Sequence, residues 1–356
     1  MPPPSRRARA GPDPLPGRRG RGALMGLAVG NALAIPTAGR ALYAPAFPQL
    51  TDGPYQTLMG GGPHALRKGQ VTEPTQLAVC LGLSLRELKR YDALDALRRY
   101  RAWQPHAIAV SEAMKEVLDE CQECAPPLVP SAGRRIWLRR FRKSTDAGAL
   151  ARTAPLGVYL ARNPPARTQA SLEDSALTHF APLSQLACAA LNAAIAHAMT
   201  GGSDLQAEDL IPAAESGLSL AGAALGRAEP DAIQDVAAAA AALRQDLELA
   251  RRDDPQLYGP EVHLHRPAHH AVRAAFRLAF WELLHVPSWE GALLDVIHRG
   301  GDTEAHAAVA GALLGAFHGD EAIPQDWRRM VLEVLAQSRG PLWDVYHPRH
   351  LVTLAL

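Results

Sequence analysis

The sequence predicts an all-α protein, a compact orthogonal bundle of helices. Alanine and leucine dominate the chain, which is 47% hydrophobic but only 5% aromatic, and both are strong helix formers. Apolar residues recur at helical spacing in one segment after another, whereas no segment has a convincing alternation typical of strands. With 356 residues the chain is long enough to bury a large core.

Composition argues against several classes of partner. The net charge is +1, so no global field favours nucleic acid or a membrane surface, and no apolar run is long enough to span a bilayer. Cys80 and Cys188 lie in apolar helical patterns and are expected in the core, while Cys121 and Cys124 lack the second ligand pair of a zinc site. We therefore expect a reduced, cytoplasmic protein, and a monomer.

The N-terminus differs in composition from the rest. Residues 1–20 are rich in proline and arginine and lack the apolar stretch of a secretory signal, which predicts a disordered tail. Residues 21–356 are expected to form a single domain. It opens with the almost uniformly apolar segment 22–37, which predicts a buried helix that ends near Pro36.

Two predicted helices begin with acidic residues. One covers residues 72–91, with Thr72 as N-cap, Glu73 next, and a proline that is tolerated because it falls in the first turn. The other follows a glycine pair and begins with Asp302 and Glu304. Carboxylate and hydroxyl oxygens suit Mg²⁺, and two such starts that converge would form a site. Taken alone, each start also fits ordinary helix capping.

Two further segments suggest anion binding. "DAGALAR", which includes Gly148 and Arg152, runs from a loop into a helix within residues 145–162 and offers backbone N–H groups. His179 lies in a loop just before a long alanine-rich helix, where it would be able to contact a phosphate or stack on a base. Taken alone, an ordinary loop and a solvated or capping histidine are the favoured explanations of these segments.

Four stretches, taken in order, resemble one family. They are "RGALMGLAVGNALAIPTA", "GGGPHALRKGQVTEPTQLAVCLGLSL", "DAGALARTAPLGVYLA" with "SALTHFAPLSQLACAAL", and "WEGALLDVIHRGGDTEAHAAVAGALLGAFHG". Over residues 21–327 the sequence resembles the ADP-ribosylglycohydrolases. The resemblance implies an all-α fold with two Mg²⁺ ions in a central cleft, and hydrolysis of the glycosidic bond between ADP-ribose and an acceptor, often arginine.

The resemblance also implies roles for individual residues. Thr72, Glu73, Asp302 and Glu304 match metal-binding positions, and a carboxylate, Glu73 or Glu304, would activate water. Gly148, Arg152 and His179 match positions near the ADP-ribose. The partner implied is ADP-ribose or an ADP-ribosylated protein.

The chain departs from the family pattern at the same site. Pro74 and Ala305 stand where the family has an aspartate and a threonine among its metal ligands, and Ala38 and Asn31 replace two further acids. Asp146 stands at a usual glycine of the phosphate loop, where a carboxylate would repel a pyrophosphate. We therefore expect one Mg²⁺ or none.

Three functions remain open on the sequence. The first is a hydrolase of ADP-ribosyl bonds that uses one Mg²⁺. The second is a binding protein that retains ADP-ribose or a related nucleotide but has lost turnover. The third is a structural relative without a ligand, because a fold can outlast its chemistry.

Overall fold

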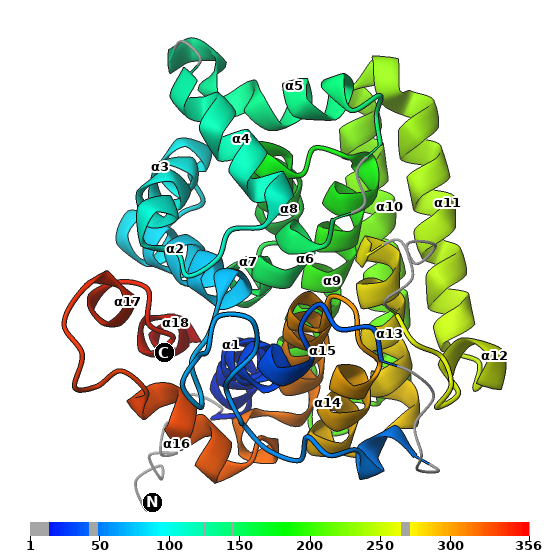
Figure 1. Ribbon diagram of the computed structural model, residues 1–356. Coiled ribbons are helices and arrows are strands. Elements are labelled where there is room, and N and C mark those ends of the chain that lie inside the picture. The colour runs from blue at the N-terminus through cyan, green and yellow to red at the C-terminus, as the bar shows by residue number, and fades with distance from the viewer. Residues whose placement is uncertain (1–13, 43–48, 124–125, 144–145, 265–270, 356) are drawn as a thin grey trace, which may run out of the picture.

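In the computed structural model, which describes residues 14–42, 49–123, 126–143, 146–264 and 271–355, the chain is helical and contains no strand in these ranges (Figure 1). Short 3₁₀ turns join several of the α-helices. The helices are α1 (Pro14–Ala34), α2 (Glu73–Leu88), α3 (Ala93–Trp103), α4 (Glu112–Glu123), α5 (Ala132–Arg139), α6 (Gly148–Arg152), α7 (Ala154–Tyr159), α8 (Pro164–Thr178), α9 (Pro182–Thr200), α10 (Leu210–Ala228), α11 (Ile233–Ala250), α12 (Pro255–Tyr258), α13 (Ala271–His285), α14 (Trp289–His298), α15 (Thr303–His318), α16 (Gln325–Glu333), α17 (Pro341–Asp344) and α18 (Arg349–Val352).

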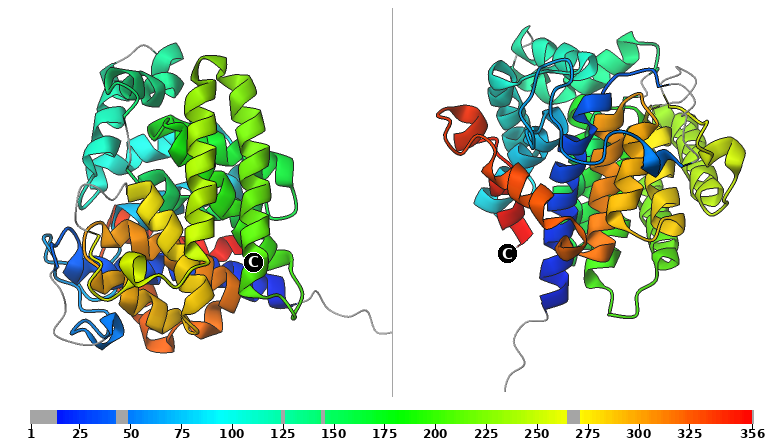
Figure 2. Two further views of the ribbon diagram at one scale, coloured as in Figure 1. Left: turned by 90° about the vertical axis from the view of Figure 1, so that its right-hand side faces the viewer. Right: turned by 60° about the horizontal axis from the view of Figure 1, so that its bottom comes forward.

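Helices α1 and α15 run side by side through the middle of the molecule (Figures 1 and 2). Glycines allow their backbones to touch: a Cβ on Gly26 would lie 2.0 Å from the Gly311 carbonyl oxygen, and one on Gly22 would lie 2.1 Å from that of Gly315. Real Cβ atoms do not approach a backbone so closely, so only glycine fits these positions. This contact fixes how α15 lies against α1.

Other helices cover this central pair. Helix α9 is buried along most of its length and packs on α7, α8 and α10, and the long α10 and α11 face the viewer in the left view of Figure 2. A second apolar cluster, which includes Tyr100 and Trp103 of α3, joins α2, α3, α4 and α5. Cys80 and Cys188 are buried, as the sequence predicts.

The N-terminal prediction is wrong in part. Residues 1–13 lie outside the described residues, but residues 14–20 are the first two turns of α1 rather than a disordered tail. Their arginines have partners: Arg19 donates to the carbonyls of Ala198 and Gly201 at the end of α9, and Arg18 pairs with Glu321. The arginines of this basic segment therefore bind a carboxylate and helix-end carbonyls elsewhere in the fold. Composition alone predicted that the segment would be disordered.

Two other predicted boundaries shift. The segment 145–162 forms two short helices, α6 and α7, because Pro155 begins a new helix instead of continuing the first. Helix α8 extends to Thr178, so the loop before α9 is shorter than predicted. Among the described residues, no helix combines the length and the apolar character that a bilayer crossing requires. The division into one domain and a tail stays a prediction.

Candidate active site

The starts of α2 and α15 converge on one cavity of about 190 Å³. Two further segments complete its wall, the loop before α4 and the loop that leads into α6. The residues that line it are Thr72, Glu73, Pro74, Ala109, Val110, Ser111, Asp146, Gly148, Asp302, Glu304 and Ala305. The two acidic helix starts, separated by more than 200 residues in the sequence, thus share a site, to which Asp146 adds a fourth carboxylate.

On the α2 side, protein groups hold both candidate ligands. The Ser111 backbone N–H donates to Oε2 of Glu73 at 2.5 Å and the Ser111 hydroxyl donates to Oε1 at 2.8 Å. Burial raises the pKa of Glu73, and the two Ser111 hydrogen bonds oppose that shift. Asn31 donates to the Thr72 hydroxyl at 2.8 Å and accepts from the Thr72 N–H at 2.9 Å. The family aspartate at position 31 is thus replaced by an amide that anchors this helix start to α1.

On the α15 side, the carboxylates are less constrained. Asp302 caps the helix by accepting from the Ala305 N–H, at 3.4 Å, and stays in contact with solvent in the cavity. Although part of the side chain is exposed to solvent, the protein around it restricts its hydration and raises its pKa to about 7, and the negative charges of Asp146, Glu304 and Glu73 add to the shift. Glu304 accepts a hydrogen bond from the Thr72 hydroxyl, and burial raises its pKa as well.

Behind the cavity, a chain of hydrogen bonds holds Asp146. Its Oδ1 lies 2.7 Å from Nε2 of His179, and Nδ1 of His179 lies 2.8 Å from the Thr178 hydroxyl. Arg152 donates to that hydroxyl, so the hydroxyl proton is left for Nδ1 and Nε2 carries the proton that is donated to Asp146. Burial works to raise the pKa of Asp146, but the His179 and Gly148 hydrogen bonds bring it below its ordinary value.

Two of the predicted ADP-ribose contacts have different positions from those expected. Arg152 is fully buried, pairs with Asp174 at 3.1 Å and lies under the Tyr100 ring, so its role is structural and it does not line the cavity. His179 is 2% exposed and reaches the cavity only through Asp146. Gly148 does line the cavity. The sequence motif located the loop correctly but could not show which side chains point outward.

The donor set does not fit a divalent metal ion as it is arranged. Mg²⁺ requires a near-octahedral set of oxygens at about 2.0–2.1 Å. Here both Glu73 oxygens bind Ser111, and the Thr72 hydroxyl is shared between Asn31 and Glu304. In the part of the chain that the structure describes, no three His, Cys, Asp or Glu side chains form a group that could hold a metal ion. The closure of these hydrogen bonds, more than the missing donors, is what opposes a metal.

Ser111 and Asp146 are the site residues that the sequence did not assign to binding. Ser111 follows an unremarkable loop, and no motif marks it. Asp146 was noted only as an unfavourable substitution in the phosphate loop. The available clue to Asp146 was His179, which follows Thr178, because a histidine can hydrogen-bond to a carboxylate and hold it in position.

These features define a class: an all-α protein with an acid-lined cavity where helix starts meet, as in hydrolases of this architecture. Comparison with known proteins then names the family. The ADP-ribosylglycohydrolase model matches residues 12–350, and the chain belongs to that family.

Individual relatives are distant but cover most of the chain. The ADP-ribosyl-[dinitrogen reductase] glycohydrolase of Rhodospirillum rubrum is 23% identical over 325 residues, 87% of this chain and 88% of the relative. The ADP-ribosylarginine hydrolase Tri1 of Pseudomonas putida (strain GB-1) is 25% identical over 343 residues, 92% of this chain and 80% of the relative. A solved structure, described as an ADP-ribosylglycohydrolase-related protein complex, has a TM-score of 0.65 at 24% identity and covers 96% of this chain and 99% of its own, which shows the shared fold.

Proposed function

We propose that this protein hydrolyses the glycosidic bond between ADP-ribose and an acceptor on a modified protein, with arginine the preferred acceptor. The activities for which the two relatives are named support the bond and the acceptor. The observation that carries the proposal is the convergence of Glu73, Asp302 and Glu304 on one cavity. A cavity of about 190 Å³ is smaller than a typical ligand pocket, so only one end of the ADP-ribose would enter it.

The proposed mechanism uses the α15 carboxylates. Glu304 takes a proton from water while the water oxygen bonds to the anomeric carbon of the ribose, and the carbon–nitrogen bond to the acceptor breaks. The leaving nitrogen takes up a proton. Asp302, with a pKa near 7, exchanges protons with cavity water beside Glu304. Glu73, held by Ser111, provides fixed negative charge next to the cationic guanidinium of the acceptor.

The family's magnesium is not needed in this proposal. When bound, the metal in this family is expected to orient the ribose and polarise water. Because the oxygens of Glu73 and Thr72 are already bonded within the protein, we propose turnover without a divalent cation.

The direct test is release of ADP-ribose from an arginine-ADP-ribosylated protein, measured by chromatography with and without excess chelator. Release that chelator leaves unchanged supports the proposal. Release that chelator abolishes and magnesium restores would show that the side chains rearrange around a cation, and would overturn the metal-free form.

A second candidate is a binding protein without turnover. The observation that favours it is the same locked arrangement at Glu73, together with Pro74 and Ala305 in place of ligands. It predicts thermal stabilisation by ADP-ribose with no release of ADP-ribose in the assay above.

A further inference from the structure

A groove at the far end of α9 contains a buried arginine without an acid. Arg167 of α8 is only 8% exposed, and its guanidinium donates to the Ala161 carbonyl oxygen at 2.9 Å. Among the described residues, no carboxylate pairs with it. Burying a charge without a partner is unfavourable, so an unpaired cation in such a position needs an explanation.

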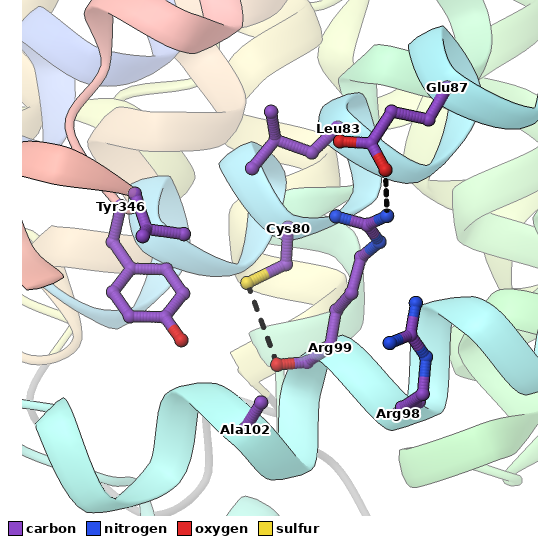
Figure 3. Close-up of a pocket in the computed structure, with 8 residues that line it drawn as sticks. Cys80, Leu83, Glu87, Arg98, Arg99, Ala102 and Tyr346 are labelled. Atoms are coloured by element: carbon purple, nitrogen blue, oxygen red, sulfur yellow. Dashed lines mark hydrogen bonds and ion pairs between the residues drawn. The ribbon is translucent and has the colours of Figure 1, made fainter.

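Two other buried arginines have an acidic partner. Arg152 pairs with Asp174, and Arg299 pairs with Asp295 at 2.6 Å. Figure 3 shows a cavity beside Cys80 in which Arg99 pairs with Glu87. Asp95 also binds Arg99, and it pairs with Arg98 as well. Each of those guanidinium groups is neutralised within the protein. At Arg167 burial alone acts, and it lowers the pKa of the guanidinium.

Arg167 lines a groove of about 380 Å³ between α8, α9 and α10. His197 and Ser216 also line it and bring further donors, while Ala193 and Ala196 form part of an apolar floor. No Asp or Glu is among the lining residues. A groove of this size accommodates a small organic molecule.

The carboxyl end of α9 does not repel an anion in this groove. The carboxyl end of a helix carries partial negative charge, which would repel one. Arg19 offsets that charge because it donates to the carbonyl oxygens of Ala198, Gly201 and Gly202, at 2.8, 2.9 and 3.2 Å. Arg19 therefore reduces the negative charge that this helix end would otherwise present to the groove.

We infer that this groove, which we call the Arg167 groove, binds a small organic oxyanion, a phosphate or a carboxylate carried on a short apolar body. The guanidinium fork matches two oxygens of either group, and the alanine floor matches the carbon body. The site is separate from the acidic cavity: α9 begins at Pro182, just after His179, and Ala193, where the helix first lines the groove, lies about 16 Å further along it.

The test is calorimetric titration of the full chain with inorganic phosphate, butyl phosphate and butyrate. We expect saturable binding that is tighter for butyl phosphate or butyrate than for inorganic phosphate, and their relative affinities distinguish the two head groups. Arg167→Met should weaken it by about tenfold or more, because a charge-assisted hydrogen bond is lost. The matched control, Arg98→Met, removes a paired, exposed arginine and should leave binding unchanged.

Two further measurements make the outcome decisive. ADP-ribose in the acidic cavity should not compete with the oxyanion. If Arg167→Met does not fold, Arg167→Lys with Ser216→Ala should still weaken binding several-fold. The absence of binding to all three probes, equal binding by the wild type and the Arg167 variants, or full competition by ADP-ribose would each overturn the inference.

Discussion

The first turn of α15 and the rest of the same helix have different surroundings and different roles. The body of the helix is packed against α1 so closely that Gly311 and Gly315 have no space for a methyl group. The first turn opens into the cavity, where Glu304 and Ala305 stand in place of an aspartate and a threonine expected in this family. The donors of the site and the packing that positions them thus depend on different residues of one helix.

The packing of α15 and the chemistry of the side chains in its first turn are therefore separable in this fold. The α1–α15 contact holds the body of the helix in place, whereas the first turn carries the side chains that line the cavity. The predictions below test that separation from the larger expected effects to the smaller.

The largest effect is expected behind the cavity, at Arg152. Arg152→Met leaves the buried Asp174 without its ion-pair partner, and breaking a buried pair in this way destabilises by about 3–5 kcal/mol. Urea unfolding would measure the loss. The double variant Arg152→Met with Asp174→Asn removes both charges and should recover much of it. A single variant as stable as the wild type would contradict the structural role of this arginine.

The next effect concerns the packed body of α15. Gly311→Ala places a Cβ 2.2 Å from the Gly26 carbonyl oxygen, so the two helices must separate, and we expect a loss of about 3 kcal/mol. The matched control is Gly222→Ala in α10, where a Cβ meets nothing within 4 Å; it should stabilise by about 0.5–1 kcal/mol. Denaturation midpoints of the two variants that shift in the same direction would contradict the close-contact argument.

The sequence predicted the packing better than the site. Uniformly apolar segments with glycines indicated buried helices, and the acidic helix starts were identified together with the loop at Gly148. It could not show that Arg152 points into the core or that Ser111 binds Glu73, because both facts depend on tertiary neighbours far along the chain. The basic segment at the start of α1 was misread for the same reason: its partners lie near residues 198–202 and 321.

A smaller effect is expected in the first turn of α15. Under the proposed function, Glu304→Gln removes the group that accepts the proton from water, and kcat should fall about a hundredfold with little change in KM. ADP-ribose release under steady-state conditions measures both constants. Glu112→Gln is the matched control: its side chain, 94% exposed, lies next to Ser111 without lining the cavity. Equal activity of both variants would exclude Glu304 as the base.

The smallest effect concerns how the free energy of unfolding changes with pH. It separates the contribution of the packed region from that of the cavity. Glu282 of α13 is fully buried, and burial together with the charge of Asp295 raises its pKa well above the ordinary value. The folded state thus keeps a proton that the unfolded chain releases above about pH 4–5, so the free energy of unfolding falls as pH rises above that range, by up to about 1.4 kcal/mol per pH unit.

Glu282→Gln has the shape of the protonated acid and cannot ionise. We expect the variant to match the wild type near pH 4 and to exceed it in stability by a margin that grows as the pH rises to 8, measured by urea unfolding across this range. The exposed Glu290→Gln on α14 serves as control and should retain the wild-type slope. The pH dependence that remains in Glu282→Gln comes from the other groups with shifted pKa, which include Asp302 in the cavity, with a pKa raised to about 7, and the buried His347, with a pKa lowered to about 4. An unchanged slope would mean that Glu282 is ionised in the folded protein.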